Sequence, residues 1–206
     1  MANDVRQRTL IVACGALARE IRAVLAQSGP LSALVDVEYL PAPLHNRPQL
    51  IPAAVEAVLR ARADSYARIV VAYADCGTGG LLEPVLARYG ATRLPGSHCY
   101  EFFAGAAVFA ALAEEEPGTF YLTDFLVRQF DQLVMVGLGL DRHPELRDQY
   151  FGNYRRVVLL SQSCDEVLVD LGRSAAAKLS LQFEHRHVGL EPFAGALTGM
   201  IGEVAP

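Results

Sequence analysis

Short runs of apolar residues alternate with longer amphipathic segments along most of the chain. The short runs are bounded by Gly, Pro or polar residues and predict buried strands. The expected strands are Thr9–Ala13, Val35–Leu40, Arg68–Ala72, Arg156–Leu160 and Leu179–Phe183. The amphipathic segments have helical spacing, and the expected helices are Ala16–Ser28, Pro48–Ala63, Gly80–Tyr89, Tyr100–Glu115, Asp124–Val136, Pro144–Asn153 and Asp165–Lys178. This alternation is typical of an α/β fold with a mostly parallel sheet flanked by helices.

The strand and helix pattern occurs in two similar blocks, one before about Tyr89 and one after about Pro117. The helix between the blocks is apolar around most of its circumference, so we expect it to be buried or to lie at a subunit contact. A homodimer is therefore a possible assembly. The blocks are joined without a long linker or a low-complexity segment, which favours a single α/β domain over residues 1–206 with two pseudo-symmetric βα halves.

The composition is that of a protein with a substantial core. The chain has 206 residues, of which 52% are hydrophobic, and this is ample for one large domain. The net charge is −5 and Lys and Arg form no long run, which argues against nucleic acid as the main partner. The apolar tract Phe102–Ala113 is about half the length of a membrane span, and the N-terminal residues do not form a signal sequence. We therefore expect a cytoplasmic protein whose cysteines are reduced.

Three of the four cysteines stand at the ends of expected strands. Cys14, Cys76 and Cys164 each follow a buried apolar run, and Cys99 begins the apolar helix. The carboxyl ends of parallel strands share one edge of a sheet, where ligands of α/β folds usually bind. A cysteine between a strand and a helix also favours its thiolate form, which suits a nucleophile or a metal ligand. The alternative is that each cysteine is a small buried residue.

The segment after Cys76 is rich in glycine. Gly77, Thr78, Gly79 and Gly80 permit tight turns and close approach of a ligand, so they are candidate cofactor-binding residues that could cradle a phosphate. The segment matches neither the Walker loop nor the dinucleotide fingerprint. A glycine-rich turn without a ligand is the alternative.

Two loops supply further candidates for chemistry. His45 follows the second expected strand and would reach the same edge as Cys14 and Cys76, where a neutral imidazole can bind zinc or act as a base. His98 and Glu101 flank Cys99 and are candidate acid–base or supporting groups. The alternatives are a solvent-exposed or capping role for His45 and a helix-capping role for Glu101.

The second half of the chain contains its own polar strand end. Cys164 lies between a strand and a helix, where neighbouring hydroxyls and acids could bind substrate or cap the helix. His185 and His187 alternate in a late strand and so point to one face. This geometry can hold a metal, but it also arises on any exposed strand.

Taken together, these residues predict a metal site formed by Cys14, His45, Cys76 and Cys99. Three ligands and one open position would suit a zinc ion that activates a thiol or water. Four thiolates would instead suit an iron–sulfur cluster. A metal-free enzyme with Cys76 or Cys99 as nucleophile and His45 or His98 as base is a further alternative.

Four short motifs occur in a fixed order along the chain: Cys-Gly-Ala-Leu-x-x-Glu at Cys14–Glu20, Leu-His-Asn-x-Pro at Leu44–Pro48, Tyr-x-x-Cys-Gly at Tyr73–Gly77, and Pro followed by Cys at Pro95–Cys99. This order resembles a family of bacterial and archaeal proteins known as domain of unknown function 1638 (DUF1638). Members look similar to proteins encoded among corrinoid-dependent methyltransferase systems. The resemblance implies a role in methyl or one-carbon transfer, with a small-molecule substrate and a corrinoid protein or methyltransferase as partner. A non-catalytic accessory protein that binds a corrinoid is the alternative.

Overall fold

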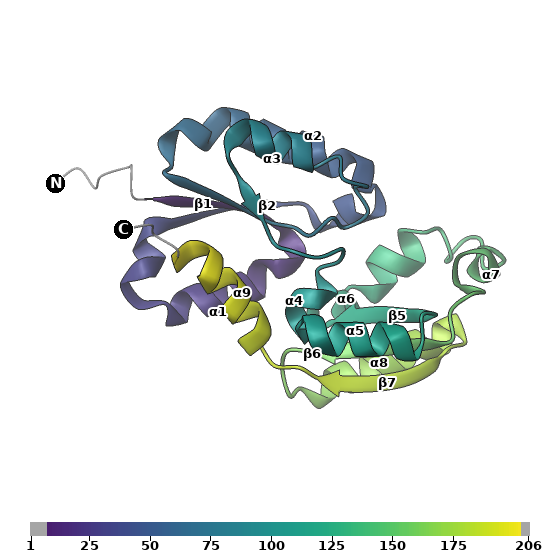
Figure 1. The fold of residues 1–206 in the computed structure, drawn as a ribbon. Helices are drawn as coiled ribbons and strands as arrows, with labels where there is room; N and C mark the ends of the chain where they lie inside the picture. Colours follow the sequence, from purple (N-terminus) through teal and green to yellow (C-terminus); the bar gives the residue numbers. More distant parts are fainter. Residues whose placement is uncertain (1–7, 203–206) are drawn as a thin grey trace. The chain divides into compact units, whose positions relative to one another are not determined.

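The computed structural model describes residues 8–202, and these residues divide into two compact units. One unit comprises the described parts of Met1–Cys99 and Phe193–Pro206, and the other comprises Tyr100–Pro192. Each unit contains its own parallel sheet with flanking helices, as Figure 1 shows. The α/β class and the parallel strand pairing are thereby confirmed. The expected single sheet is instead two sheets, and the single-domain description stays a prediction.

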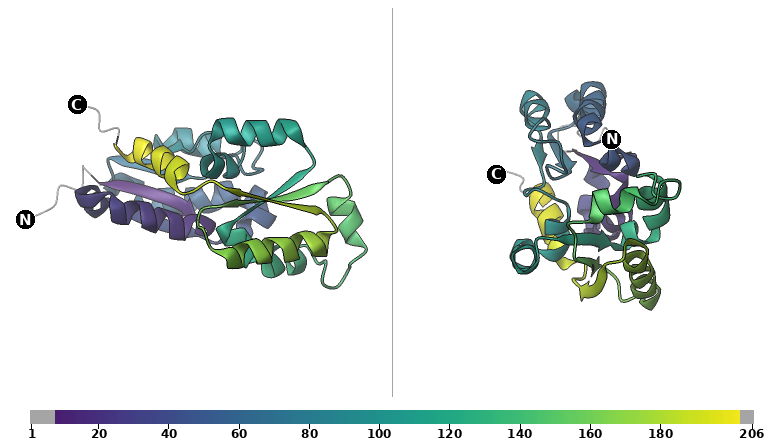
Figure 2. Two further views of the ribbon diagram at one scale, coloured as in Figure 1. Left: turned by 90° about the horizontal axis from the view of Figure 1, so that it is seen from below. Right: turned by 90° about the vertical axis from the view of Figure 1, so that its right-hand side faces the viewer.

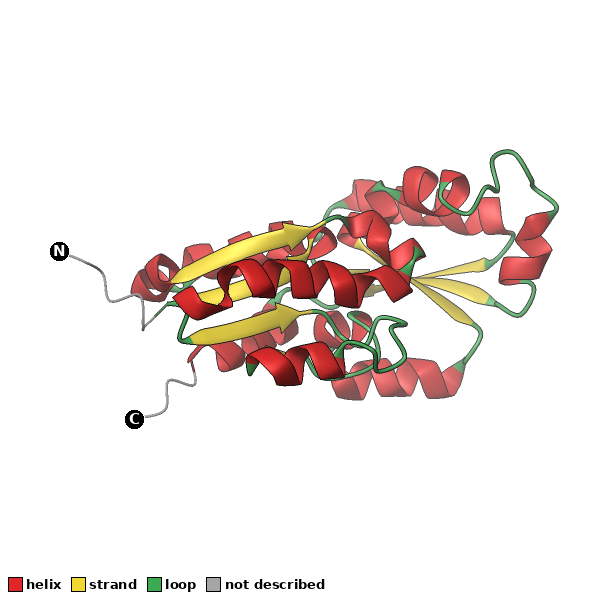
Figure 3. Ribbon diagram, turned by 90° about the horizontal axis from the view of Figure 1, so that it is seen from above, coloured by secondary structure: helices red, strands yellow, loops and turns green. Residues whose placement is uncertain are grey.

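The first sheet has the strand order β2-β1-β3-β4. Its strands are β1 (Thr9–Cys14), β2 (Val35–Leu40), β3 (Arg68–Ala72) and β4 (Thr92–Arg93), and every pairing is parallel. In Figure 3 these strands, drawn in yellow, run in one direction. All residues of β1 are buried, because a central parallel strand is covered on both faces.

Helices cover both faces of this first sheet. They are α1 (Ala18–Gln27), α2 (Ile51–Arg62), α3 (Glu83–Tyr89) and α9 (Glu191–Gly202). Figure 1 shows α2 and α3 on one face and α1 and α9 on the other. Although α9 comes from the end of the chain, Arg68 of β3 donates a hydrogen bond of 2.8 Å to the Met200 carbonyl oxygen. The sequence pattern did not predict α9 or β4, nor the strand Thr119–Thr123 of the second unit.

The second sheet has the strand order β5-β6-β7. The strands are β5 (Thr119–Thr123), β6 (Arg156–Ser161) and β7 (Gln182–His187), and the helices are α4 (Tyr100–Ala104), α5 (Ala106–Glu115), α6 (Asp124–Arg128), α7 (Leu146–Phe151) and α8 (Glu166–Leu179). Alternate residues of β6 face two separate cores: Val157 and Leu159 pack with α6 and α8, while Val158 and Leu160 pack with α4 and α5. Figure 2 shows α5 and α8 on opposite faces of this sheet.

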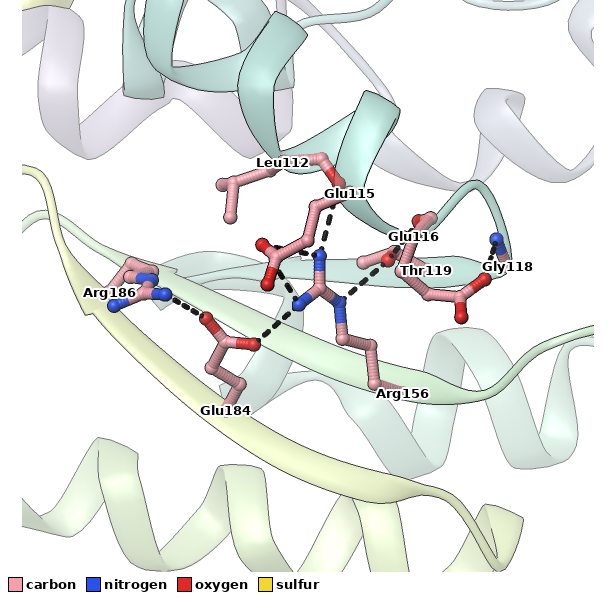
Figure 4. A network of polar contacts seen from close by, with 8 residues as sticks. All are labelled: Leu112, Glu115, Glu116, Gly118, Thr119, Arg156, Glu184 and Arg186. Atoms are coloured by element: carbon pink, nitrogen blue, oxygen red, sulfur yellow. Dashed lines mark hydrogen bonds and ion pairs between the residues drawn. The ribbon is translucent and has the colours of Figure 1, made fainter.

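A buried arginine joins the strands of the second sheet to α5. Arg156 is 8% exposed; it donates hydrogen bonds to the Thr119 hydroxyl at 2.9 Å, to Glu184 at 2.8 Å and to the Leu112 carbonyl at 3.0 Å (Figure 4). Glu115 of α5 also lies within ion-pair distance, at 3.3 Å. These partners offset the cost of burying the guanidinium group.

Several expected elements differ from the structure. The expected helix Tyr100–Glu115 is interrupted at Gly105, whose φ of 77° ends α4. The expectation that this helix is buried was wrong for α5, where Leu112 is the buried residue and Val108 is 47% exposed. Its role in a subunit contact stays a prediction.

Other boundaries shifted in the second unit. The expected helix Asp124–Val136 is divided into α6 and a π-helix, Asp131–Val136. The last strand begins at Gln182 rather than Leu179, because Leu179 is the buried final residue of α8. None of the helices within residues 8–202 has the length and apolar character needed to cross a membrane.

Candidate metal centre

The first side chain of the site is Cys14, the last residue of β1. It is 2% exposed, and its sulfur accepts a hydrogen bond from the Ala16 N–H at 3.4 Å. The next residue, Gly15, lies close to the end of β2. A side chain at this position would place its Cβ atom only 3.0 Å from the Leu40 carbonyl oxygen. Glycine at position 15 therefore allows the two strand ends to approach each other closely.

His45 lies beyond the neighbouring strand end, in a short 3-10 helix over Ala42–Asn46. Its Nδ1 atom is 3.5 Å from the sulfur of Cys14. Its ring also stacks on the ring of Tyr73, with centroids 5.9 Å apart and planes inclined by 14°. Tyr73 directly follows β3 and is 1% exposed. Cys14 at the end of β1, His45 beyond β2 and Tyr73 beyond β3 thus meet at the carboxyl edge of the first sheet.

Cys76 and Cys99 are brought together by two loops that pair outside the regular sheet. The Asp75 N–H donates to the Gly96 carbonyl at 3.3 Å, and the Cys76 N–H donates to the Ser97 carbonyl at 2.9 Å. Cys76 itself has a φ of 49°, which is uncommon for a residue other than glycine. The unusual backbone at Cys76 is therefore held in place by the loop that carries Cys99.

Three of the four predicted ligands form one compact group. The donor atoms of His45, Cys76 and Cys99 all lie within 4.8 Å of one another. Two sulfurs on a tetrahedral zinc stand about 3.8 Å apart when the Zn–S bonds are about 2.3 Å, so a small closure of this group would suit a zinc ion. Cys14 contacts the group through His45 rather than joining it.

The charges within this group are strongly coupled. The neighbouring thiol of Cys99, together with the proximity and charge of His45, lowers the pKa of Cys76 from 9.0 to about 5 although burial opposes the change. The neighbouring Cys76, together with burial, raises the pKa of Cys99 well above 9.0. Burial lowers the pKa of His45, but its contacts with Cys14 and Cys76 outweigh this and raise it to about 10. Without a cation, the group therefore holds one thiolate at Cys76 beside an imidazolium at His45.

Two buried polar atoms at the site lack a hydrogen-bond partner among residues 8–202. They are Nε2 of His45 and the hydroxyl oxygen of Tyr73. Burial and the neighbouring thiols, Cys14 first among them, raise the pKa of Tyr73, which keeps its hydroxyl protonated. A buried imidazole nitrogen without a partner is costly, and a metal ion at the sulfurs of Cys76 and Cys99 would satisfy it.

The glycine-rich segment has a different partner from the phosphate that its sequence suggested. The carboxylate of Asp75 accepts hydrogen bonds from the Gly80 N–H at 2.8 Å, the Gly79 N–H at 3.2 Å and the Thr78 hydroxyl at 2.8 Å. These bonds lower the pKa of Asp75. The donors that would cradle a phosphate are thus engaged within the loop, which fixes the turn after Cys76. The cofactor-binding role of Gly77, Thr78, Gly79 and Gly80 stays a prediction.

The other predicted residues lie outside this group. His98 is exposed next to Cys99, and Glu101 belongs to the second unit, so their acid–base roles stay predictions. Cys164, His185 and His187 also belong to the second unit. The sequence analysis assigned no role to Tyr73, although a tyrosine immediately after a mostly buried strand and three residues before Cys76 was a usable signal.

The fold and the site define the class of the protein: an α/β protein with parallel sheets and a cysteine–histidine group at a sheet edge that could hold a metal. The chain belongs to the family described as "Protein of unknown function (DUF1638)", whose family model matches residues 39–197. The match includes His45, Cys76 and Cys99 and begins after Cys14. Comparison with curated proteins and with solved structures gave no match.

Proposed function

We propose that the protein binds zinc through Cys76, Cys99 and His45, with a fourth coordination position left for a small-molecule thiol. The observation that carries this proposal is that the three donor atoms lie within 4.8 Å of one another. Three protein ligands and one open position are typical of catalytic zinc sites. The proposal also places the protein in the cytoplasm, where its four cysteines would stay reduced.

The charges of the site support a divalent cation. Two thiolates and a neutral imidazole would balance the charge of Zn²⁺, whereas the metal-free site cannot ionise Cys99 easily beside the Cys76 thiolate. An iron–sulfur cluster usually takes four cysteine ligands, but the first unit supplies three cysteines, at positions 14, 76 and 99. Zinc is therefore the better candidate.

Cys14 has a positioning role in this proposal. Histidines that bind metals usually donate the N–H of the other ring nitrogen to an acceptor, which fixes the tautomer. The contact of 3.5 Å between Nδ1 of His45 and the sulfur of Cys14 fits that role. It leaves the partnerless Nε2 atom of His45 to bind the metal.

The reaction that we propose for the site is methyl or one-carbon transfer to the bound thiol. A bound zinc ion would lower the pKa of a substrate thiol and so supply a nucleophilic sulfur. Transfer of a methyl group to that sulfur would form a sulfur–carbon bond as the bond between the methyl group and its carrier broke, with the electron pair left on the carrier. The resemblance to proteins encoded with corrinoid-dependent methyltransferases supports a corrinoid protein as the methyl carrier.

Metal analysis tests the proposal directly. Protein purified without an affinity tag should contain near-stoichiometric zinc, and Cys76→Ser or His45→Ala should lose it. Cys164→Ser is the matched control because Cys164 belongs to the other unit. Wild-type protein without stoichiometric metal would refute the zinc site. If zinc is present but a methylated corrinoid protein is bound without turnover, the accessory role replaces the enzymatic one.

A metal-free cysteine enzyme is the second candidate. It is favoured by the proximity of Cys76 to His45, which lowers the pKa of Cys76 and raises that of His45, as at nucleophilic cysteines. Iodoacetamide distinguishes the two candidates. Rapid alkylation of Cys76 without chelator treatment supports a nucleophile, whereas protection of Cys76 and Cys99 until a chelator is added supports zinc.

A further inference from the structure

The second unit has its own group of reactive side chains at the carboxyl edge of its sheet. Ser161 is the last residue of β6, and Cys164 lies in the loop between β6 and α8. His185 and His187 lie on β7, where the strand register pairs Leu159 with His185 and Ser161 with His187. Because side chains alternate along a strand, Ser161, His185 and His187 point to the same face of the sheet.

These side chains are connected in a continuous chain of contacts. The sulfur of Cys164 lies 3.5 Å from Nε2 of His187. The same sulfur is 3.9 Å from Nδ1 of His187, and Nδ1 is 3.2 Å from the Ser161 hydroxyl oxygen, which is also 2.8 Å from Nε2 of His185. A thiol beside an imidazole ring that a third group orients is an arrangement found at nucleophilic cysteines.

One set of tautomers satisfies every contact in this chain. Burial and the neighbouring His187 lower the pKa of His185, which favours a neutral ring whose Nε2 accepts the hydrogen of the Ser161 hydroxyl. The Ser161 oxygen can in turn accept the Nδ1–H of His187. In that tautomer Nε2 of His187 carries no hydrogen and can accept the proton of Cys164.

A buried carboxylate holds the cysteine loop in place. Asp124, which is 3% exposed, accepts hydrogen bonds from the Gln162 N–H at 2.9 Å, the Ser163 N–H at 3.1 Å and the Ser163 hydroxyl at 2.6 Å. The Gln162 side chain accepts one from the Asp124 N–H at 3.1 Å in return. Cys164 is nevertheless exposed, so a rigid loop presents its thiol to solvent.

We propose that Cys164 and His187 form a second reactive-thiol site, independent of the metal centre, which exchanges with disulfides of low-molecular-weight thiols. His187 takes the Cys164 proton as the sulfur attacks one sulfur of the disulfide. A new S–S bond forms, the old S–S bond breaks, and the departing thiolate receives the proton from His187. One disulfide is consumed and one is formed, so no further oxidant is needed.

The loop favours disulfides over acyl compounds as reaction partners. Acyl transfer needs free N–H donors for the oxyanion that forms on the carbonyl oxygen. The N–H groups of Gln162 and Ser163, next to the cysteine, already donate to Asp124. Disulfide exchange needs only a thiolate and a proton donor for the leaving group.

The product of this exchange should be long-lived. Cys164 is the only cysteine in the sequence Tyr100–Pro192, so no second thiol of this unit can displace the attached group. Cys164 would therefore stay linked to the small thiol as a mixed disulfide until another thiol from solution releases it.

The test uses the full chain with oxidised glutathione, and mass spectrometry measures the mixed disulfide on the Cys164 peptide. Folded protein should react at Cys164 faster than the same cysteine in the urea-unfolded chain. Loss of a positioned base usually costs 10²–10⁴ in rate, and for this exposed pair we expect His187→Gln to slow the reaction about tenfold or more. His143→Gln is the control, because His143 is exposed in the same unit and contacts Glu145 instead; its rate should equal that of the wild type.

The positioning role of Ser161 is tested in the same assay. Ser161→Ala should slow the exchange, and Ser161→Thr, which keeps the hydroxyl, should restore it, while thermal unfolding shows that each variant is folded. A rate at Cys164 no higher than in the unfolded chain, or an unchanged rate in His187→Gln, would overturn the proposal. A rate that rises after chelator treatment would also overturn it, since Cys164 would then be a metal ligand.

Discussion

In the metal-free protein, the pairing of Cys76 with His45 should give stability a characteristic dependence on pH. Folding lowers the pKa of Cys76 from 9.0 to about 5, so its contribution is complete above pH 9 and is lost as pH falls through 5. Folding raises the pKa of His45 from 6.5 to about 10, so its contribution is complete below pH 6.5 and is lost as pH rises through 10. Between pH 6.5 and 9 the two slopes cancel, because the folded and unfolded chains bind equal numbers of protons at this pair.

The magnitude follows from the two outer intervals. From pH 6.5 down to 5 the unfolded chain binds one more proton, so the free energy of unfolding should fall by about 2 kcal/mol, at about 1.4 kcal/mol per pH unit. From pH 9 up to 10 the folded chain binds the extra proton, and the free energy of unfolding should fall by about 1.4 kcal/mol. The pair therefore predicts a plateau with a decline on each side.

Urea unfolding of chelator-treated protein, followed by circular dichroism across this pH range, measures the effect. Subtracting the profile of the double variant Cys76→Ser/His45→Ala from that of the wild type isolates the two groups, because His45 alone would keep the part of its raised pKa that comes from Cys14. Cys164→Ser is the control and should reproduce the wild-type profile. A difference profile without the two declines would refute the thiolate–imidazolium pair.

Three further predictions concern single side chains. Adding zinc to metal-free protein at about 100 times the dissociation constant should raise the free energy of unfolding by about 2.7 kcal/mol, an effect that denaturant titration should find absent in His45→Ala. Tyr73→Phe should change the free energy of unfolding by less than about 1 kcal/mol, because the hydroxyl has no partner among residues 8–202 to lose; a larger loss in thermal unfolding would show that the hydroxyl is bonded. Arg156→Met should destabilise the protein by about 1–3 kcal/mol, since the Leu112 carbonyl and the Thr119 hydroxyl lose their buried partner while Glu184 keeps its ion pair with Arg186. A calorimetric change below about 1 kcal/mol for this last variant would show that the arginine network contributes little.

The strands β1, β3 and β6 each lie between two neighbouring strands and are mostly buried apolar runs, so the hydrophobic pattern located them to within one residue. The edge strand Val35–Leu40 was also predicted with its observed bounds; its first four residues alternate between apolar and polar, and only Val35 and Leu40 are buried. The edge strand β5, which has three apolar residues between two threonines, was not predicted. The edge strand β7 has the sequence Gln-Phe-Glu-His-Arg-His and is mostly exposed, so hydrophobic pattern placed it three residues too early. The two-residue β4 leaves no pattern at all.

The approach of His45 to Cys14 was predictable, because parallel neighbours β1 and β2 end side by side, with Cys14 paired to Leu40. The approach of Cys99 to Cys76 depends on irregular backbone hydrogen bonds to Gly96 and Ser97, and no local pattern encodes such bonds. The sequence also could not show that Cys76 and Cys99 group with His45 while Cys14 contacts its Nδ1 atom. All three cysteines follow expected strands or turns, so their sequence positions look alike.

X-ray absorption at the zinc edge of the tag-free protein tests the central claim most directly, because it identifies the metal and its ligands together. We predict one zinc per chain with two sulfur neighbours at about 2.3 Å and a nitrogen neighbour at about 2.0 Å, and the loss of one sulfur neighbour in Cys99→Ser. Protein that holds no zinc, or zinc surrounded only by oxygen and nitrogen, would contradict the account.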